Sequence, residues 1–266
     1  MSERENLVAE LWYATAPDLS DRLLLEGLRA VSPGTEAQDG SWVVPYDGGE
    51  RPTVGDGPGT PPLVTVVLPG SALGVGGKTL PETSQTWDWV GADEALAAAR
   101  GSLLVTEMFA EPYGPRDRVA ALVSVVAALT AATSPLAVAW PTSQRVADPS
   151  APVTDGLGGL LNVRLFTVAE DEDERVMDTR GLAPFGLPDV QIHFRDLDPG
   201  ALAGLLYATA SYLLDAGDVI EDGNTIPGPD GDEHWRCEHE DALVAPARRV
   251  LDVDPGDPYA AGRRAR

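Results

Sequence analysis

A glycine-rich stretch, Ala72-Leu-Gly-Val-Gly-Gly-Lys78-Thr79, has residue types that suit phosphate binding. It follows a predicted strand and fits the relaxed P-loop pattern, with alanine in place of the first glycine. In a P-loop, backbone N–H groups hold the phosphates, and the lysine and threonine stand at a helix N-terminus. Here Leu80-Pro81 follows at once and opposes a helix, and Glu107 is a weak substitute for a magnesium-binding aspartate. The alternative interpretation is a flexible glycine-rich loop.

A second set of residues, His234, Cys237 and His239, has side chains that ligate metals. A structural zinc site needs four ligands, and the sequence offers no second cluster of histidine and cysteine. We therefore expect no metal and no other cofactor. The segment is interpreted as a surface loop with one tucked cysteine.

The stretch 177–194 contains candidates for acid–base chemistry, which needs carboxylates or histidine converging in a cleft. These candidates are Asp178, Asp189 and His193. The alternative interpretation is that Asp178 accepts backbone hydrogen bonds in a turn and that His193 faces solvent from a strand. Phe185 lies between prolines and glycines, so it is expected to pin a half-buried loop.

Three tryptophans, Trp87, Trp89 and Trp140, are candidates for lining a binding groove. Aromatic side chains are also common in cores and interfaces, and this alternative stays open. The complete set of predicted binding residues is Trp87, Trp89, Trp140, Asp178, Phe185 and Asp189.

The elements that must position these residues follow from hydrophobic periodicity. Helices are predicted at 18–31, 92–100, 116–130 and 200–216, the last with Asp198 as N-cap and Pro199 in its first turn. Strands are predicted at 7–13, 41–46, 62–68, 102–109, 134–140, 160–168, 190–194 and 218–220, with a short strand around residue 235. The charge run 170–174 is expected to be a solvated turn.

This order of elements predicts an α+β fold, a mixed β-sheet with helices packed mainly on one face. An alternative layout is two split-βαβ, ferredoxin-like halves. We expect a single α+β domain over residues 1–246, with halves at 1–140 and 141–246 as the alternative division. Residues 247–266 are rich in Asp, Pro, Gly and Arg, and they are expected to fray.

The net charge is −23 and there is one cysteine. Strong acidity disfavours nucleic acid and anionic membranes as partners, since both attract lysine and arginine. It favours a fast encounter with a basic protein partner, although a general acidity of the host proteome would also explain it. The acidic N-terminus and the lack of an apolar run of about 18 residues predict a cytoplasmic protein.

Several motifs in order resemble a bacterial family known as domain of unknown function 4261. They are Trp87-Asp-Trp89, Ser102-Leu-Leu-Val-Thr106, Leu136-Ala-Val-Ala-Trp140, Asp178-Thr-Arg-Gly-Leu182, Phe185-Gly-Leu-Pro-Asp189, Asp215-Ala-Gly-Asp-Val-Ile and Asp222-Gly-Asn-Thr-Ile226. The resemblance runs from about the first strand to about Ile226. It implies an α+β fold, with no established activity or cofactor.

The absence of a complete catalytic motif, together with the acidity, predicts a non-enzymatic protein-binding module. A specific version is an immunity- or antitoxin-like protein that neutralises a basic partner. The alternative is a small-molecule enzyme or nucleotide-binding protein that uses the glycine-rich loop 72–79 or a cleft near Asp178.

Overall fold

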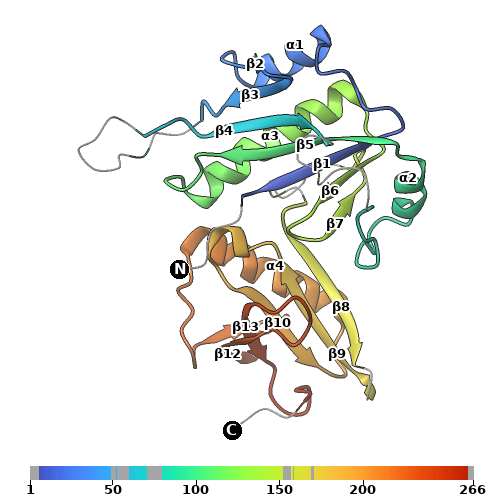
Figure 1. Ribbon diagram of the computed structural model, residues 1–266. Helices are drawn as coiled ribbons and strands as arrows, with labels where there is room; N and C mark the ends of the chain where they lie inside the picture. Colours follow the sequence, from blue (N-terminus) through green and yellow to red (C-terminus); the bar gives the residue numbers. More distant parts are fainter. Residues whose placement is uncertain are drawn as a thin grey trace. The chain divides into compact units, whose positions relative to one another are not determined.

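Two sheets, one in each of two units of the chain, form the framework of the protein (Figure 1). A computed structural model describes residues 6–48, 52, 60–70, 80–151, 157, 159–168 and 171–262. The chain divides at Leu160 and Leu161 into an N-terminal unit and a C-terminal unit. The single domain over residues 1–246, and the alternative halves at 1–140 and 141–246, stay predictions.

The N-terminal unit has a seven-stranded sheet with the order β2-β3-β4-β5-β1-β6-β7, and every neighbouring pair is antiparallel. Its strands are β1 (Val8–Tyr13), β2 (Glu36–Gln38), β3 (Ser41–Pro45), β4 (Val64–Pro69), β5 (Gly101–Met108), β6 (Ala137–Trp140) and β7 (Arg145–Ala147). Its helices are α1 (Arg22–Val31), α2 (Ala92–Ala98) and α3 (Pro115–Thr133).

This sheet contains two interlocked split βαβ units. Strand β5 lies between β1 and β4, and β1 lies between β5 and β6. The second crossover, from β5 to β6, contains helix α3. The order of the predicted elements had placed helix α2 in this role. The predicted α+β class is therefore confirmed, with the split arrangement extending over β1 to β6.

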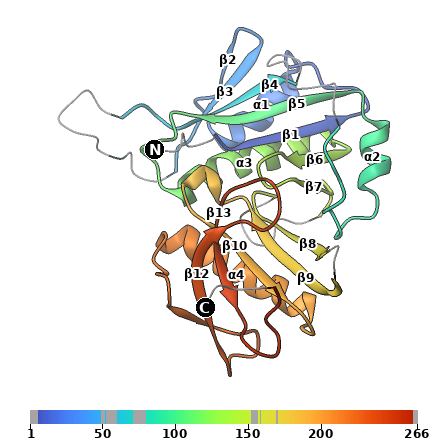
Figure 2. The same cartoon turned by 60° about the horizontal axis from the view of Figure 1, so that its bottom comes forward.

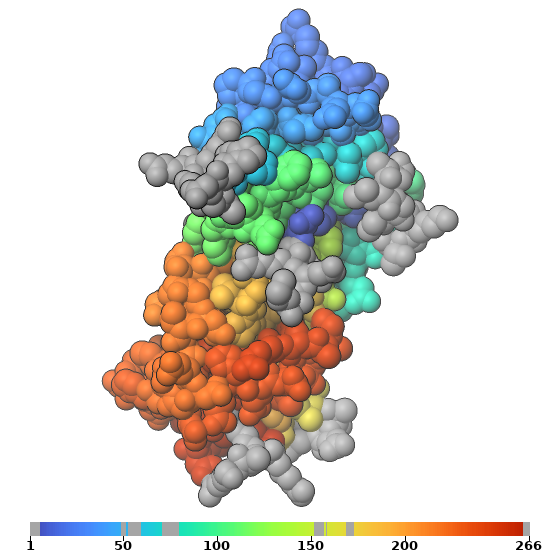
Figure 3. All heavy atoms as spheres, turned by 60° about the vertical axis from the view of Figure 1, so that its left-hand side comes forward, coloured from blue at the N-terminus to red at the C-terminus, as the bar shows by residue number. Residues whose placement is uncertain are grey.

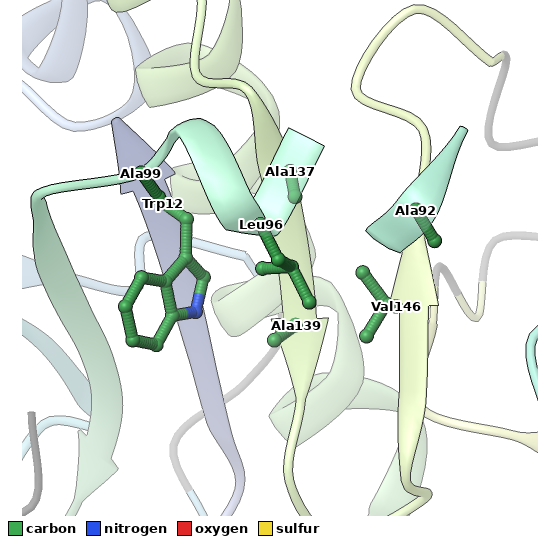
Figure 4. Packing of buried hydrophobic residues seen from close by; sticks show 7 residues of the cluster. All are labelled: Trp12, Ala92, Leu96, Ala99, Ala137, Ala139 and Val146. Carbon is green, nitrogen blue, oxygen red and sulfur yellow. The ribbon is translucent and has the colours of Figure 1, made fainter. Parts of the chain in front are cut away.

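The helices of the N-terminal unit cover both faces of its sheet, α1 and α3 on one face and α2 on the other. Helix α3 packs against β1, β4 and β5 and against α1. Helix α2 places Leu96 between Trp12 and Val146, in a small apolar cluster (Figure 4). This cluster fixes α2 on the sheet because its members are shielded from water.

The C-terminal unit has a six-stranded mixed sheet with the order β11-β12-β13-β10-β9-β8, in which only β10 and β13 pair in parallel among the described strands (Figure 2). Its strands are β8 (Asn162–Val168), β9 (Asp171–Arg180), β10 (Asp189–Phe194), β11 (Thr225–Pro227), β12 (His234–Asp241) and β13 (Arg249–Asp254). Helix α4 (Pro199–Ala216) packs against β8, β9 and β10, and the 3-10 helix η1 (Ala183–Phe185) lies between β9 and β10.

Three sequence predictions in this unit are wrong. Residues 249–254, expected to fray, form β13 between β10 and β12, because Val250, Leu251 and Val253 are buried on the sheet. Residues 171–174, expected to be a turn, open the long strand β9, in which Asp171 pairs with Val168 and Arg175 pairs with Thr167 across a register shift. Residues 218–220, expected to be a strand, precede β11 without strand structure.

Within the described residues, no helix has the length and apolar character needed to cross a membrane.

Candidate functional site

Asp178 on β9 is the centre of a buried polar cluster in the C-terminal unit. Its carboxylate accepts a bidentate pair of hydrogen bonds from Arg164 on β8, with Nε–Oδ1 2.8 Å and Nη2–Oδ2 2.6 Å. The guanidinium of Arg248 also donates to Asp178 Oδ2. The Asp178 side chain is fully buried, so one carboxylate joins two strands and the segment before β13.

Asp189 at the start of β10 completes the cluster. Arg248 Nε donates to Asp189 Oδ2 at 3.0 Å, and the Leu182 backbone N–H donates to Oδ1 at 3.2 Å. Thr179 lies beside it, and its hydroxyl accepts the Val190 N–H at 2.8 Å. These bonds hold the loop that carries η1 across the end of β9 and β10.

Burial and neighbouring charges shift the pKa values of the cluster in opposite directions. Burial raises the pKa of Asp189, while Arg248 and the hydrogen bond from Leu182 lower it. Burial lowers the pKa of Arg180, and the charge of Asp189 raises it in part. A network of this kind is stable only while its members stay paired. Asp178 and Asp189, both candidates from the sequence, lie in this cluster inside the fold, where arginines and a backbone N–H group occupy their carboxylates.

Phe185 lies in η1 and is buried, so the predicted anchoring of its loop is confirmed. His193, expected to face solvent, is largely covered, with its Nε2 atom 3.2 Å from Glu174 Oε2 on β9. The His193 side chain therefore lies beside Glu174 of the neighbouring strand β9.

The candidate metal ligands lie on β12 but do not converge. Successive strand residues face opposite sides, so His234 faces away from Cys237 and His239. Cys237 is buried, and burial followed by the charge of Asp252 raises its pKa to about 11. The His239 ring lies between Asp222 (Nδ1–Oδ1 2.7 Å) and Asp218 (Nε2–Oδ1 2.9 Å), and thereby clips the segment after α4 to β12.

The three tryptophans of the N-terminal unit do not form one surface. Trp87 is 51% exposed, while Trp89 packs against the cluster of Trp12 and α2. Trp140 is buried and closely approached by Gly159, and its strand alternation places it on the sheet face opposite Ala139 of that cluster. Only Trp87 and Trp89 can belong to a common surface.

The glycine-rich loop lies at residues 71–79, outside the described residues, and its phosphate-binding role stays a prediction. Glu107, the weak magnesium-ligand candidate, is fully buried and pairs with Arg118 of α3. It also accepts the Leu7 N–H at 2.8 Å. This carboxylate therefore has a structural role between β1, β5 and α3.

A groove on the surface of the C-terminal unit is the feature that sequence reasoning missed. It has a volume of about 800 Å³ and runs between one face of α4 and the segment 219–229. Its lining includes Tyr212 and Val219, which are 53% and 49% exposed. Exposed apolar surface of this kind in a hollow is typical of binding sites.

Acidic residues are frequent in the segment that forms this groove. From residue 198 to residue 233 the sequence has no lysine or arginine and eight acidic residues, all of them exposed: Asp198, Asp215, Asp218, Glu221, Asp222, Asp230, Asp232 and Glu233. Figure 3 shows α4 and the following segment, in orange, at the molecular surface.

Two sequence signals pointed to these features. Arg164 lies between apolar neighbours in a predicted strand, and a charge in such a place requires a buried partner. Ala201, Gly204 and Ala208 recur at helical spacing in a segment without basic residues. Arg248 gave no signal, because it follows a loop in a segment that was expected to fray.

The comparisons with known proteins fit this division of the chain. The family model of the domain of unknown function (DUF4261) matches residues 178–254, from the Asp178 cluster through β13. The motifs at 87–140 lie outside the match, and the match continues beyond Ile226. No curated protein and no solved structure matches the chain. Over residues 178–254 the C-terminal unit is thus similar to the domain of unknown function 4261.

Proposed function

We propose that the protein is a non-enzymatic binding module that captures a basic protein through its C-terminal unit. The observation that carries this proposal is the stretch 198–233, which has eight exposed acidic residues and no lysine or arginine, beside an apolar groove. An apolar centre with a charged rim is the usual anatomy of a protein interface. The acidic rim speeds encounter with a basic partner and makes binding sensitive to salt.

The buried arginine–aspartate cluster supports a binding role over a catalytic one. Asp178 and Asp189 are occupied by Arg164, Arg248 and backbone N–H groups, so they stabilise the sheet that carries the groove. A general base must instead reach the proton that it abstracts.

The proposal is tested by affinity capture from the lysate of the protein's own cells, at low and moderate salt. The triple variant Asp230→Lys, Asp232→Lys, Glu233→Lys reverses the acidic rim. The matched control, Glu36→Lys, Asp39→Lys, Glu111→Lys, makes the same charge change at exposed positions of the N-terminal unit. We expect a basic protein that is released by salt, lost in the first variant and retained in the control. Equal retention by both variants, or no basic partner at low salt, contradicts the proposal.

A more specific form of the proposal is an immunity- or antitoxin-like role, in which the basic partner is toxic to the cell. Its test is expression of the captured partner alone and together with this protein. Growth arrest that co-expression relieves supports the role. A captured partner that leaves growth unchanged contradicts this specific form and leaves the binding module in place.

A further inference from the structure

The groove of the C-terminal unit has a floor that suits close approach by another backbone. Ala201, Gly204 and Ala208 lie on one face of α4 at i, i+3 and i+7. A Cβ atom added at Gly204 would meet nothing within 4 Å, so the space above the helix is open. Tyr212 and Val219 stand at one end with large apolar surfaces exposed.

Two of the polar side chains of the groove are already engaged within the chain. Thr209 Oγ1 donates to the Leu205 carbonyl at 2.9 Å, and Asn224 Oδ1 accepts the Glu221 N–H at 3.2 Å. The residues that line the groove carry no ionisable side chain other than the Tyr212 phenol. A site for a polar small molecule needs convergent polar groups to orient it. The lining therefore favours an apolar side-chain stripe as the occupant.

The groove adjoins a second hollow of about 320 Å³, which shares Ala201, Gly228 and Pro229 with it. This hollow is acidic, because Asp198, Asp230, Asp232 and Glu233 line it. The two hollows together offer an apolar channel that leads into a negatively charged end. Charge complementarity requires the occupant to carry its positive charge at one end.

A helix fits this surface better than an added strand. Strand β11 is the edge of the sheet, but it has three residues and ends in Pro227, which has no N–H to donate. Small residues along α4 instead allow a partner helix to lie close. Ala201, Gly204 and Ala208 share one face of α4, so the close approach extends over about two turns of the helix.

We infer that the α4 groove and the acidic hollow bind an amphipathic helix of the basic partner, with its apolar stripe along Ala201–Ala208 and its lysine- or arginine-rich end in the hollow. This inference rests on the proposed function and adds the partner's secondary structure and orientation.

The test uses the full chain and a fluorescent synthetic peptide measured by anisotropy. The peptide forms a helix with leucines at i, i+3, i+4 and i+7 and a cluster of lysines at one end. A permuted peptide has the same composition, but its leucines are spread around the helix. We expect the first peptide to bind about tenfold or more tightly than the permuted one.

Variants of the chain locate the binding. Ala208→Arg fills the groove, and Ala216→Arg places the same charge at an exposed position of α4 outside the lining. Gly204→Leu fills the groove without adding charge, in open space on a helix. We expect Ala208→Arg and Gly204→Leu to weaken binding about tenfold or more and Ala216→Arg to change it little, with unchanged circular dichroism.

The results distinguish the inferred helix site from the proposed capture of a basic protein. If both peptides bind alike and the groove variants bind like the native chain, the inferred helix site is overturned, while capture by charge stands. If neither peptide binds at low salt, the capture of basic segments by this surface is overturned as well.

Discussion

The Asp178 carboxylate accepts hydrogen bonds from two arginines, Arg164 and Arg248, that come from different parts of the chain. Its replacement by alanine would leave Arg164 and Arg248 with their shared acceptor removed inside the fold. Breaking a buried pair of this kind costs about 3–5 kcal/mol. We expect Asp178→Ala to lower the free energy of unfolding by that amount, as measured by urea unfolding followed by circular dichroism.

The control for this prediction is Glu238→Ala, which removes a carboxylate from an exposed pair with Arg236 at 2.7 Å. Exposed pairs contribute within about 1 kcal/mol, because water screens them. An Asp178→Ala protein as stable as the Glu238→Ala protein would show that the buried cluster is dispensable.

Glu10 on β1 is buried with its carboxylate beside Ser102, whose hydroxyl donates at 2.6 Å. Burial raises the pKa of Glu10, and the bond from Ser102 offsets part of this. The ionised carboxylate therefore costs stability at neutral pH, and the cost disappears as pH falls through the raised pKa.

Accordingly, Glu10→Gln should stabilise the protein at neutral pH, because the amide oxygen still accepts the Ser102 bond without a charge. The gain should shrink at about pH 4, near the ordinary pKa of glutamate. Urea midpoints at the two pH values measure it. A larger stabilisation by Glu10→Gln at the acidic pH than at neutral pH would contradict the raised pKa of Glu10.

At the residue scale, sequence reasoning found only half of the buried cluster. Asp178 and Asp189 stood out because they flank a loop rich in Gly and Pro. Their arginine partners lie 14 and 59 or more residues away along the chain, so only strand pairing brings them together. The role of His239 was missed for the same reason. Its partners Asp218 and Asp222 come close to it only when the segment after α4 folds against β12.

Helix α4 shows how an element can be predicted while its surface is not. Its boundaries follow from the N-cap Asp198, whose side chain accepts the Ala201 N–H, and from Gly217 with φ +83° at the C-cap. The periodicity predicts one apolar stripe with Leu202, Leu205, Leu206, Tyr212 and Leu213. Leu202, Leu206 and Leu213 are buried, whereas Tyr212 is 53% exposed. The groove depends on where the segment 219–229 lies, which the helix sequence does not determine.

Gly204 provides a test of this helix as an element. In the helix interior glycine is about 1 kcal/mol less favourable than alanine, and an added Cβ meets no neighbour. We expect Gly204→Ala to raise the free energy of unfolding by about that amount, measured in urea. Gly217→Ala should have the opposite sign, since its positive φ disfavours a Cβ. Destabilisation by Gly204→Ala would mean that the open face of α4 is covered.

Strand prediction failed where pairing overrides composition. The acidic residues 171–174 were predicted as a turn, yet they open β9, whose residues 175–178 pair with both β8 and β10. Arg249–Asp254 reads as part of a polar tail, yet β10 and β12 bond to it on both sides. Both cases depend on partners distant in sequence, which local patterns do not encode.

At the scale of the whole molecule, the two units have separate sheets, each with its own helices. We expect residues 161–262 expressed alone to fold, with cooperative thermal unfolding by circular dichroism. Residues 178–254, the range of the family match, should remain unfolded, because they lack β8, Arg164 and most of β9. A folded 178–254 fragment would show that these strands are dispensable.

The place of β13 in its sheet has a consequence for synthesis of the chain. The strand pairs with β10 on one side and β12 on the other. Until residue 254 has left the ribosome, the meander of β8, β9 and β10 and the hairpin of β11 and β12 have no strand to join them. Each then presents an unpaired strand edge, the kind of surface on which chains associate wrongly. Between the emergence of β12 and that of β13, the chain thus holds two open edges that a chaperone must cover.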